Sequence, residues 1–283
     1  MIALYIPLFL RIISNPIANA CQKKLSETTS SLSVNFYISL IMSLGCIIPA
    51  FFVNWTTFSL EFWGNVFLAG LFYSLGTVCL IKALYYGELS ILGPLNSYKS
   101  IIGLISAFLL LGELPTPIAI GGVIFIVLGS LCLISPTKTT LDTKNLWRSI
   151  GLRFIALLFT GFEASILKKI ILLSSPQISF ILWCFSGLVF GAILIPLLGR
   201  KLEQPKHTDW MKYFIAAICL STMQFSTNIV FSKMEVGTAL ALFQLSAVIN
   251  LFLGYKIFKE GGMLRKFIGT IIMIAGSIII LNN

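Results

Sequence analysis

Ten long apolar runs, joined mostly by very short polar connections, constrain this chain more than any other feature of its sequence. A helix that crosses the hydrocarbon core of a bilayer needs about 20 apolar residues. Backbone polar groups in lipid must find partners within their own segment, so each run is predicted to form a helix. The predicted spans are Ile2–Gln22, Val34–Val53, Phe62–Tyr86, Leu89–Leu111, Pro117–Ile134, Ser149–Leu173, Gln177–Leu198, Trp210–Phe231, Gly237–Phe258 and Leu264–Leu281.

Composition also indicates a membrane protein. The hydrophobic set makes up 57% of the 283 residues, and charged residues make up only 11%, against about 25% in soluble domains. The apolar excess must therefore face lipid. The net charge of +10 comes from basic residues that lie mostly between the apolar runs. Anionic headgroups attract such residues, so the charge predicts the lipid bilayer as a partner and argues against nucleic acid.

Enzyme chemistry and metal binding find little support in the sequence. The single histidine, His207, lies in a polar connection, and the two aspartates, Asp142 and Asp209, lie in connections as well. A Ser–His–Asp site, a zinc site or an intramembrane aspartyl pair would need such residues together inside the fold. The six cysteines form no CxxC pair. We predict a protein that is not an enzyme and has no metal or cofactor.

The first apolar run is interpreted as a spanning helix. Its end, Ala18-Asn19-Ala20, is similar to a signal-peptide cleavage site. However, no basic region precedes the run and Arg11 interrupts it, which is atypical of a secretory signal.

The two halves of the chain are alike. Five pairs of residues share a separation of 147 positions: Glu113 and Glu260, Gly122 and Gly269, Gly129 and Gly276, Trp63 and Trp210, and Pro49 and Pro196. The coincidence predicts a five-helix unit present twice, at residues 1–135 and 149–283, with a linker at 136–148. An odd number of spans per unit makes the copies insert in opposite directions, which is an inverted repeat. The predicted fold is therefore all-α, with about ten transmembrane helices in a 5+5 inverted repeat.

The four glycines of these pairs predict close helix packing. Gly122 and Gly129 are seven residues apart, as are Gly269 and Gly276, so each pair shares one helix face. Small residues let helices approach closely in a membrane, so these faces are expected to pack against other helices.

The chain resembles the EamA domains of the drug/metabolite transporter superfamily. The resemblance rests on Ala83-Leu84-Tyr85-Tyr86-Gly87, on Leu110-Leu111-Gly112-Glu113-Leu114, on the glycines of the following run, and on Lys259-Glu260 with Ala275-Gly276 in the second copy. Lysine pairs, Lys23-Lys24 and Lys168-Lys169, end the first helix of each copy, where the family often carries a lysine. The chain departs from the family at Lys99, where a proline is common, and near Phe36 and Tyr37, where an arginine is often found.

The resemblance implies 5+5 inverted helices around a central cavity, in a transporter without an ATP-hydrolysing part. Members of the family export amino acids, drugs and other metabolites, or exchange nucleotide sugars and phosphorylated compounds. We therefore predict a secondary active transporter, an exporter or exchanger, of the cell (inner) membrane that works by alternating access. A membrane scaffold or accessory subunit without its own transport cycle is the alternative from another class.

Charged residues inside the spans are the main candidates for the site. A charged side chain at mid-bilayer costs about 2.5–3.5 kcal/mol on insertion scales, so it usually faces a cavity or a partner. Lys99 and Arg11 lie near the middle of their runs, and Lys82 lies closer to a run end. Glu163 is the one carboxylate deep in a predicted span, so it is the candidate proton-coupling group.

Polar residues at helical spacing complete the predicted site. Asn96, Lys99, Ser100, Gly103 and Ser106 form one such face, which either lines a cavity or packs against a helix with Lys99 paired to Glu163. The predicted substrate-binding residues are Lys99, Asn96, Tyr73, Thr77, Arg11, Asn15, Asn19, Gln224, Asn228 and Gln244.

The balance of these charges predicts the substrate. Two central cations against one carboxylate leave a positive charge for the ligand to match. We expect a small polar metabolite that is anionic or zwitterionic, such as an amino acid, rather than a lipophilic cationic drug. A proton or a counter-substrate is the expected further partner, and the protein is expected as a monomer or a homodimer.

Charge placement and family resemblance predict opposite orientations. Fourteen of the 20 Lys and Arg residues are assigned to odd-numbered connections, Arg153 among them, and three to even-numbered ones, including Lys168. The positive-inside rule then places both termini outside the cell. The resemblance implies both termini in the cytoplasm.

Overall fold

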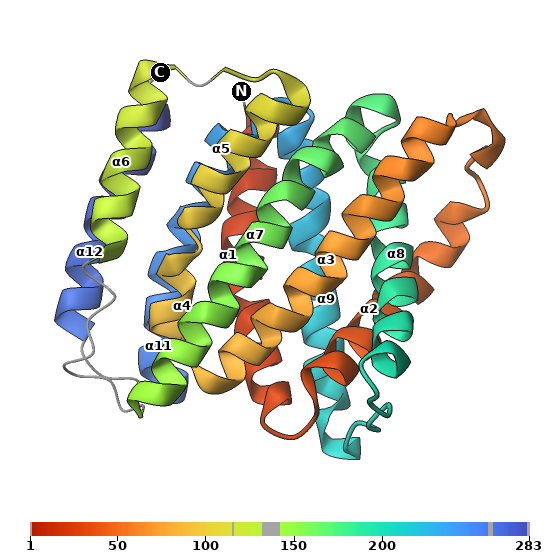
Figure 1. Cartoon of the computed structure of the whole chain (residues 1–283), viewed down its shortest axis with the longest axis horizontal. Coiled ribbons are helices and arrows are strands. Elements are labelled where there is room, and N and C mark those ends of the chain that lie inside the picture. The colour runs from red at the N-terminus through yellow and green to blue at the C-terminus, as the bar shows by residue number, and fades with distance from the viewer. Residues whose placement is uncertain (1, 115, 132–141, 260–262, 282–283) are drawn as a thin grey trace.

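The computed structural model describes residues 2–114, 116–131, 142–259 and 263–281, and within these ranges every regular element is helical (Figure 1). The elements are α1 (Ile2–Ser26), α2 (Ser31–Ala50), η1 (Trp55–Thr57), α3 (Leu60–Tyr86), α4 (Leu89–Leu95), α5 (Tyr98–Leu111), α6 (Pro117–Leu131), α7 (Thr143–Leu173), α8 (Pro176–Leu197), η3 (His207–Asp209), α9 (Trp210–Phe231), α10 (Val236–Leu242), η4 (Phe243–Leu245), α11 (Ser246–Phe258) and α12 (Met263–Leu281). The all-α fold expected from the apolar runs is confirmed.

Several helices are long and apolar enough to cross a membrane. Among the described residues there are seven such segments: Ser31–Ala50, Leu60–Tyr86, Ile91–Leu111, Thr143–Leu173, Pro176–Leu197, His207–Phe231 and Val236–Phe258. Helices α6 and α12 contribute shorter apolar segments, Ile120–Gly129 and Phe267–Gly276. Helix α1 has 25 residues, but Arg11 and several amide side chains lower its hydropathy. The chain is a multi-pass membrane protein, and the count of ten spans stays a prediction.

Two of the predicted continuous helices are broken near their middle. The run Leu89–Leu111 divides into α4 and α5 at Asn96 and Ser97, and the run Gly237–Phe258 divides at η4. At the first break Lys99 N–H donates to the Asn96 carbonyl and Ser100 N–H to the Ser97 carbonyl, both at 2.9 Å. These i to i+3 bonds satisfy the backbone where the α-helical ladder stops.

Each helix of one half packs against a helix of the other half. Helix α1 contacts α9 and α3 contacts α7, while α2 contacts α8, α4 contacts α11, α5 contacts α10, and α6 contacts α12. The set of contacts stays the same when α1–α6 are exchanged with α7–α12 in order. The core is therefore built between the halves.

Local signals explain where several helices begin and end. The Ser175 side chain accepts a hydrogen bond from the Ile178 N–H at 3.2 Å, and Pro176 occupies the first position of α8. Helix α5 ends at Gly112, whose φ of +69° is the left-handed conformation that favours glycine. This turn directs Glu113 back toward the bundle.

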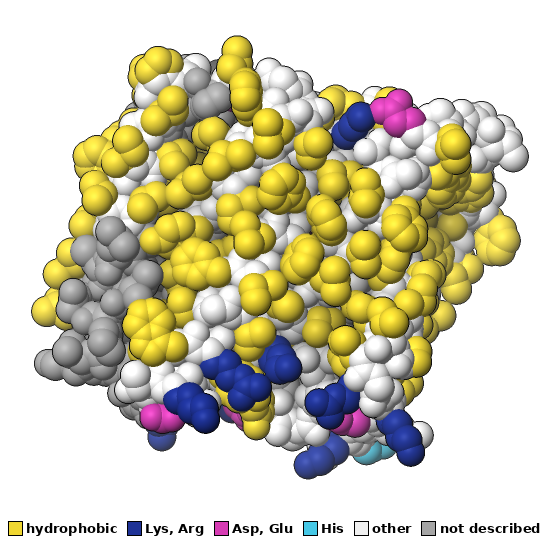
Figure 2. Space-filling view, viewed as in Figure 1, with side chains coloured by type: hydrophobic (Ala, Val, Ile, Leu, Met, Phe, Trp, Pro, Cys, Tyr) yellow, Lys and Arg dark blue, Asp and Glu magenta, His cyan; other side chains and the backbone are white. Residues whose placement is uncertain are grey.

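The surface divides into an apolar belt and a basic end. Exposed hydrophobic side chains cover the middle of the face in Figure 2, as expected for contact with lipid. Lys and Arg side chains gather mostly along the lower edge, opposite the end where α1 begins and α12 ends (Figures 1 and 2). Basic residues at helix ends or connections include Lys23, Lys24, Lys144, Arg148, Arg200, Lys201, Lys206, Lys212 and Lys256.

The glycine faces of α6 and α12 pack against each other, which confirms the prediction of close packing. A Cβ atom added at Gly129 would lie 2.7 Å from the Gly269 carbonyl oxygen. One added at Gly276 would lie 2.6 Å from the Gly122 carbonyl oxygen. The backbones are therefore too close for a larger residue at these positions.

A matched pair of substitutions on α6 tests this contact. Gly129→Ala should lower the stability of the purified protein by about 1–3 kcal/mol, because its Cβ would push against backbone atoms. Gly121→Ala should not, since a Cβ there meets nothing within 4 Å. Thermal unfolding in detergent measures both, and equal unfolding midpoints for the two variants would contradict the packing.

Candidate functional site

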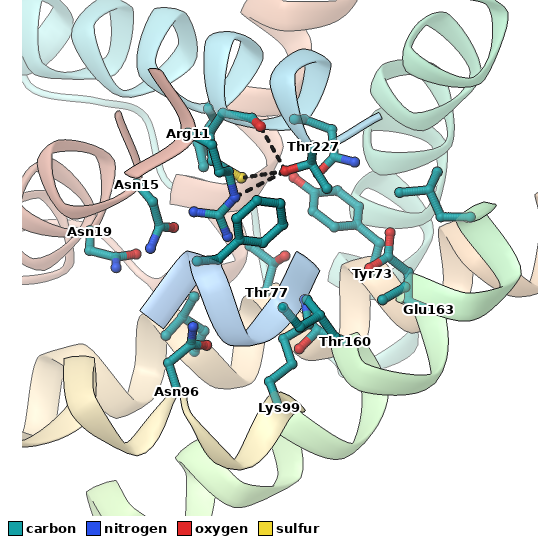
Figure 3. A pocket seen from close by; sticks show the side chains of 18 of the residues that line it. Arg11, Asn15, Asn19, Tyr73, Thr77, Asn96, Lys99, Thr160, Glu163 and Thr227 are labelled. Atoms are coloured by element: carbon teal, nitrogen blue, oxygen red, sulfur yellow. Dashed lines mark hydrogen bonds between the residues drawn. The ribbon is translucent and has the colours of Figure 1, made fainter. Parts of the chain in front are cut away.

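A polar cavity of about 90 Å³ lies at the centre of the bundle, between the two halves (Figure 3). Its lining comes from α1, α3, both broken helices, α7, α8 and α9. The polar residues that line it are Arg11, Asn15, Asn19, Gln22, Tyr73, Thr77, Asn96, Lys99, Arg153, Thr160, Glu163, Trp183, Gln224 and Thr227. Most of the predicted site residues are therefore brought together in one place.

Two predicted substrate-binding residues, Asn228 and Gln244, lie behind this lining. Asn228 accepts a hydrogen bond from the Gln224 amide at 2.9 Å and donates to the Pro176 carbonyl at 3.1 Å. The Gln244 amide donates to the Leu240 carbonyl at 2.8 Å and lies 3.4 Å from the Ser100 hydroxyl. They are not among the residues that line this cavity, and their role in substrate binding stays a prediction; helical spacing does not distinguish a lining residue from one that holds it in place.

The predicted polar face of Asn96–Ser106 also divides. Asn96 and Lys99 line the cavity. Ser106 instead lies against α7, where its hydroxyl is 2.6 Å from that of Ser165. A Cβ at Gly103 would meet Leu240 of α10. The part of this face next to the helix break, at Asn96 and Lys99, therefore lines the cavity, whereas the part at Gly103 and Ser106 packs against other helices.

Arg153 is the main residue that the sequence analysis placed wrongly. It was assigned to a polar connection, but α7 begins at Thr143, so Arg153 lies well inside the helix. Its side chain is buried and lines the cavity, and its Nη2 donates to the Asn96 Oδ1 at 2.8 Å. Its spacing from Thr160 and Glu163 on one helix face was the signal that could have identified it.

Two lysines also differ from their predicted places. Lys82, counted as a marginal charge within a span, is exposed and lies outside the central cavity. Lys168, counted at a connection, is buried in α7. The ends of these helices, Tyr86 and Leu173, were predicted correctly, so the direction in which each side chain points around its helix decides its exposure.

Arg11 is fixed from two sides. Its Nε donates to the Thr227 hydroxyl on α9 at 3.0 Å, and its guanidinium carbon lies 4.5 Å from the centre of the Phe243 ring. The side chain is only 6% exposed. The interaction joins α1 of the first half to α9 and η4 of the second half.

Several polar atoms at the cavity have no hydrogen-bond partner among the described residues. They are Arg11 Nη1, Arg153 Nε, Gln22 Oε1, Trp183 Nε1 and Glu163 Oε1. Buried polar groups in proteins are nearly always hydrogen-bonded. The unpaired atoms therefore indicate that a polar ligand or water occupies this space.

A buried ion pair joins the two halves, one residue beyond the cavity-lining Leu167. The Lys168 ammonium donates to the Glu113 carboxylate and, at 3.0 Å, to the Met234 carbonyl. The same carboxylate accepts the Val236 N–H at the start of α10 at 3.0 Å. This cluster, Glu113 with Lys168 and the start of α10, joins the two halves.

Comparison with known proteins agrees with the geometry. A polar, charged cavity between two helical halves in a membrane is typical of transporters. The model of the EamA-like transporter family matches residues 7–135 and 147–282, so the chain belongs to this family, in two copies of its repeat. It is thereby a transporter of the drug/metabolite type.

A protein of known crystal structure shares the fold, with a TM-score of 0.70 and 12% identity over 98% of this chain and 96% of the other. No curated protein sequence matches the chain.

Two adjacent lysines on α7 offer a test of the buried Lys168–Glu113 ion pair. Glu113→Gln should destabilise the protein by about 3–5 kcal/mol, because it leaves the Lys168 ammonium buried without its counter-charge. The Lys168 and Glu113 side chains are 10% and 17% exposed, whereas those of the Lys169–Glu61 pair are 37% and 64% exposed. Glu61→Gln should therefore change stability by less than about 1 kcal/mol. Chemical or thermal unfolding in detergent measures both, and similar losses would contradict a special role for the buried pair.

Proposed function

We propose that this chain is a secondary active transporter, an exporter or exchanger of a small anionic or zwitterionic metabolite across the cell (inner) membrane. The observation that carries the proposal is the cavity with Arg11, Lys99 and Arg153 on its walls and Glu163 as its carboxylate. Three cations suit an anionic group and disfavour an organic cation, because like charges repel strongly in a low-dielectric site.

The arrangement of the helices supports alternating access. The main pairings of helices between the halves are unchanged when the halves are exchanged, as expected for a 5+5 repeat with a two-fold axis. Both helix breaks lie at the cavity: Asn96 and Phe243 come from them. In inverted-repeat transporters such breaks lie near the midplane at the binding site. Rocking of one half against the other would open the cavity first to one side and then to the other.

The cluster of Glu113 with Lys168 and the start of α10 fits this cycle. It joins the halves at one side of the bundle, where Leu167 and Leu240 form part of the cavity wall. In the proposed cycle, the state in which this cluster is intact is the one closed on that side. Opening to this side would require the Lys168–Glu113 pair to separate.

Transport in proteoliposomes tests the proposal. Purified protein should accumulate members of a panel of radiolabelled amino acids and organic acids, and the accumulation should respond to a proton gradient or to an internal counter-substrate. Absence of uptake and exchange for the whole panel would favour the scaffold. A second readout is the accessibility of cysteines introduced at Asn96, Thr77 and Gln224 after the six native cysteines are replaced. A transporter should expose these positions to an aqueous reagent, whereas a scaffold without a transport cycle should not.

Glu163 is proposed to carry the coupling proton. It is 5% exposed, and its Oε1 has no partner among the described residues. Glu163→Gln should abolish gradient-driven accumulation and retain exchange, since an amide cannot take up and release a proton at this position. Glu235→Gln, at an exposed carboxylate outside the cavity, is the matched control. Normal gradient-driven accumulation in the Glu163 variant would remove this residue from the mechanism.

A further inference from the structure

Two arginines in the cavity have only neutral hydrogen-bond partners in the described structure. Arg11 donates to the Thr227 hydroxyl, and Arg153 donates to the Asn96 amide oxygen. Both side chains are at least nine-tenths buried, at 6% and 5% exposure. Each retains an unpaired nitrogen, Nη1 of Arg11 and Nε of Arg153. An arginine keeps its charge under all ordinary conditions, so both positive charges are permanent.

The other two charged residues of the lining cancel each other. The Lys99 side chain and the Glu163 carboxyl group interact electrostatically, and both line the same cavity (Figure 3). If both groups are charged, the sum of their charges is zero. If the proton moves from the lysine to the glutamate, both are neutral and the sum is again zero. While the pair holds one proton, the net charge of the described lining is therefore that of the two arginines, and uptake of the coupling proton at Glu163 would add one further positive charge.

A cavity with two uncancelled positive charges in a low-dielectric environment favours a ligand with two negative charges. Resting on the proposed transport function, we propose that the substrate is a small dianion, either a dicarboxylate or a phosphate monoester. This proposal narrows the substrate class. A monocarboxylate would cancel only one of the two positive charges, and a zwitterion, which has no net charge, would cancel neither.

The placement of the arginines supports contact with one ligand. Arg11 comes from α1 and is fixed against α9 and η4, while Arg153 comes from α7 and is fixed at the α4–α5 break. They approach the cavity from opposite halves of the chain, and each has spare N–H donors for an oxygen anion. A dianion bound between them would join the two halves at the cavity centre, as the substrate of a rocking transporter should.

Equilibrium binding to the purified full chain tests this inference without requiring transport. The probes are two pairs, each of a dianion and a monoanion: succinate against butyrate, and glycerol 3-phosphate against glycerate, all as sodium salts at matched ionic strength. Ligand binding raises the unfolding midpoint according to its affinity. In at least one pair the dianion should bind about tenfold more tightly than its monoanion partner. The pair that responds identifies the carboxylate or the phosphate source.

Charge removal at each arginine should then reduce this preference. Arg11→Gln and Arg153→Gln should each weaken dianion binding about tenfold while changing monoanion binding less, whereas Arg153→Lys should keep the preference. Arg148→Gln removes the same charge from an exposed position on α7 and should change nothing. If a glutamine variant does not fold, the wild-type comparison within each pair still decides.

The outcomes separate this inference from the proposed function. Equal binding of dianion and monoanion, tighter binding of alanine as a zwitterion, or no response to either dianion would overturn the inference. Uptake of other solutes without dianion binding would leave the transport function standing and refute the dianion. Dianion binding without any uptake or exchange would support the dianion as ligand and refute the transport function.

Discussion

Every backbone N–H and C=O group inside a bilayer needs a partner within the protein, and most features of this structure depend on that requirement. It makes the apolar runs helical, and it restricts interruptions to places where other polar groups are available. The two interruptions described here meet that condition. Asn96, at the first, accepts from Arg153 at 2.8 Å and lies 3.4 Å from Gln244, which belongs to the second. The polar centre of the protein therefore exists where the helical ladders stop, and it links both interruptions to α7.

Much of the fold could be predicted from the sequence because lipid imposes a strong rule on composition. The apolar runs, the small faces of α6 and α12, and the clustering of Arg11, Lys99 and Glu163 at one cavity all follow from hydropathy and helical spacing. The helix breaks were not predicted, because hydropathy averaged over a whole run hides them, although Gly93-Pro94 and the polar residues Asn96 to Ser100 mark the first break in the sequence. The position of Arg153 was not predicted either, because hydropathy alone cannot place the start of α7 six residues earlier than Ser149. Asn228 and Gln244 show a further limit: only three-dimensional packing separates residues that line a cavity from those that support them.

The two neighbouring lysines of α7 show how position on a helix changes the meaning of a charge. Lys168 points into the bundle and is held by Glu113 and a backbone carbonyl, whereas Lys169 points outward to Glu61. One residue of separation, about 100° around the helix, converts an exposed pair into an interaction between halves. Charge counts by connection, which treated both lysines alike, could not detect this difference. The same counts remain useful at the basic end of the bundle, where side chains reach the interface.

The two copies of the repeat are alike in backbone but not in charge. The two lysine pairs are 145 residues apart, so the register of the first helices differs by two residues from the separation of 147 found in the later helices; in this register Arg11 corresponds to Ala156 and Glu163 corresponds to Ala18. A pair of identical five-helix proteins could not build this cavity, because every charge would appear twice and like charges would face each other across the axis. Two copies joined in one chain can each carry charges that the other lacks. The different charges of α1 and α7 thus give this chain a cavity that a symmetric homodimer could not form.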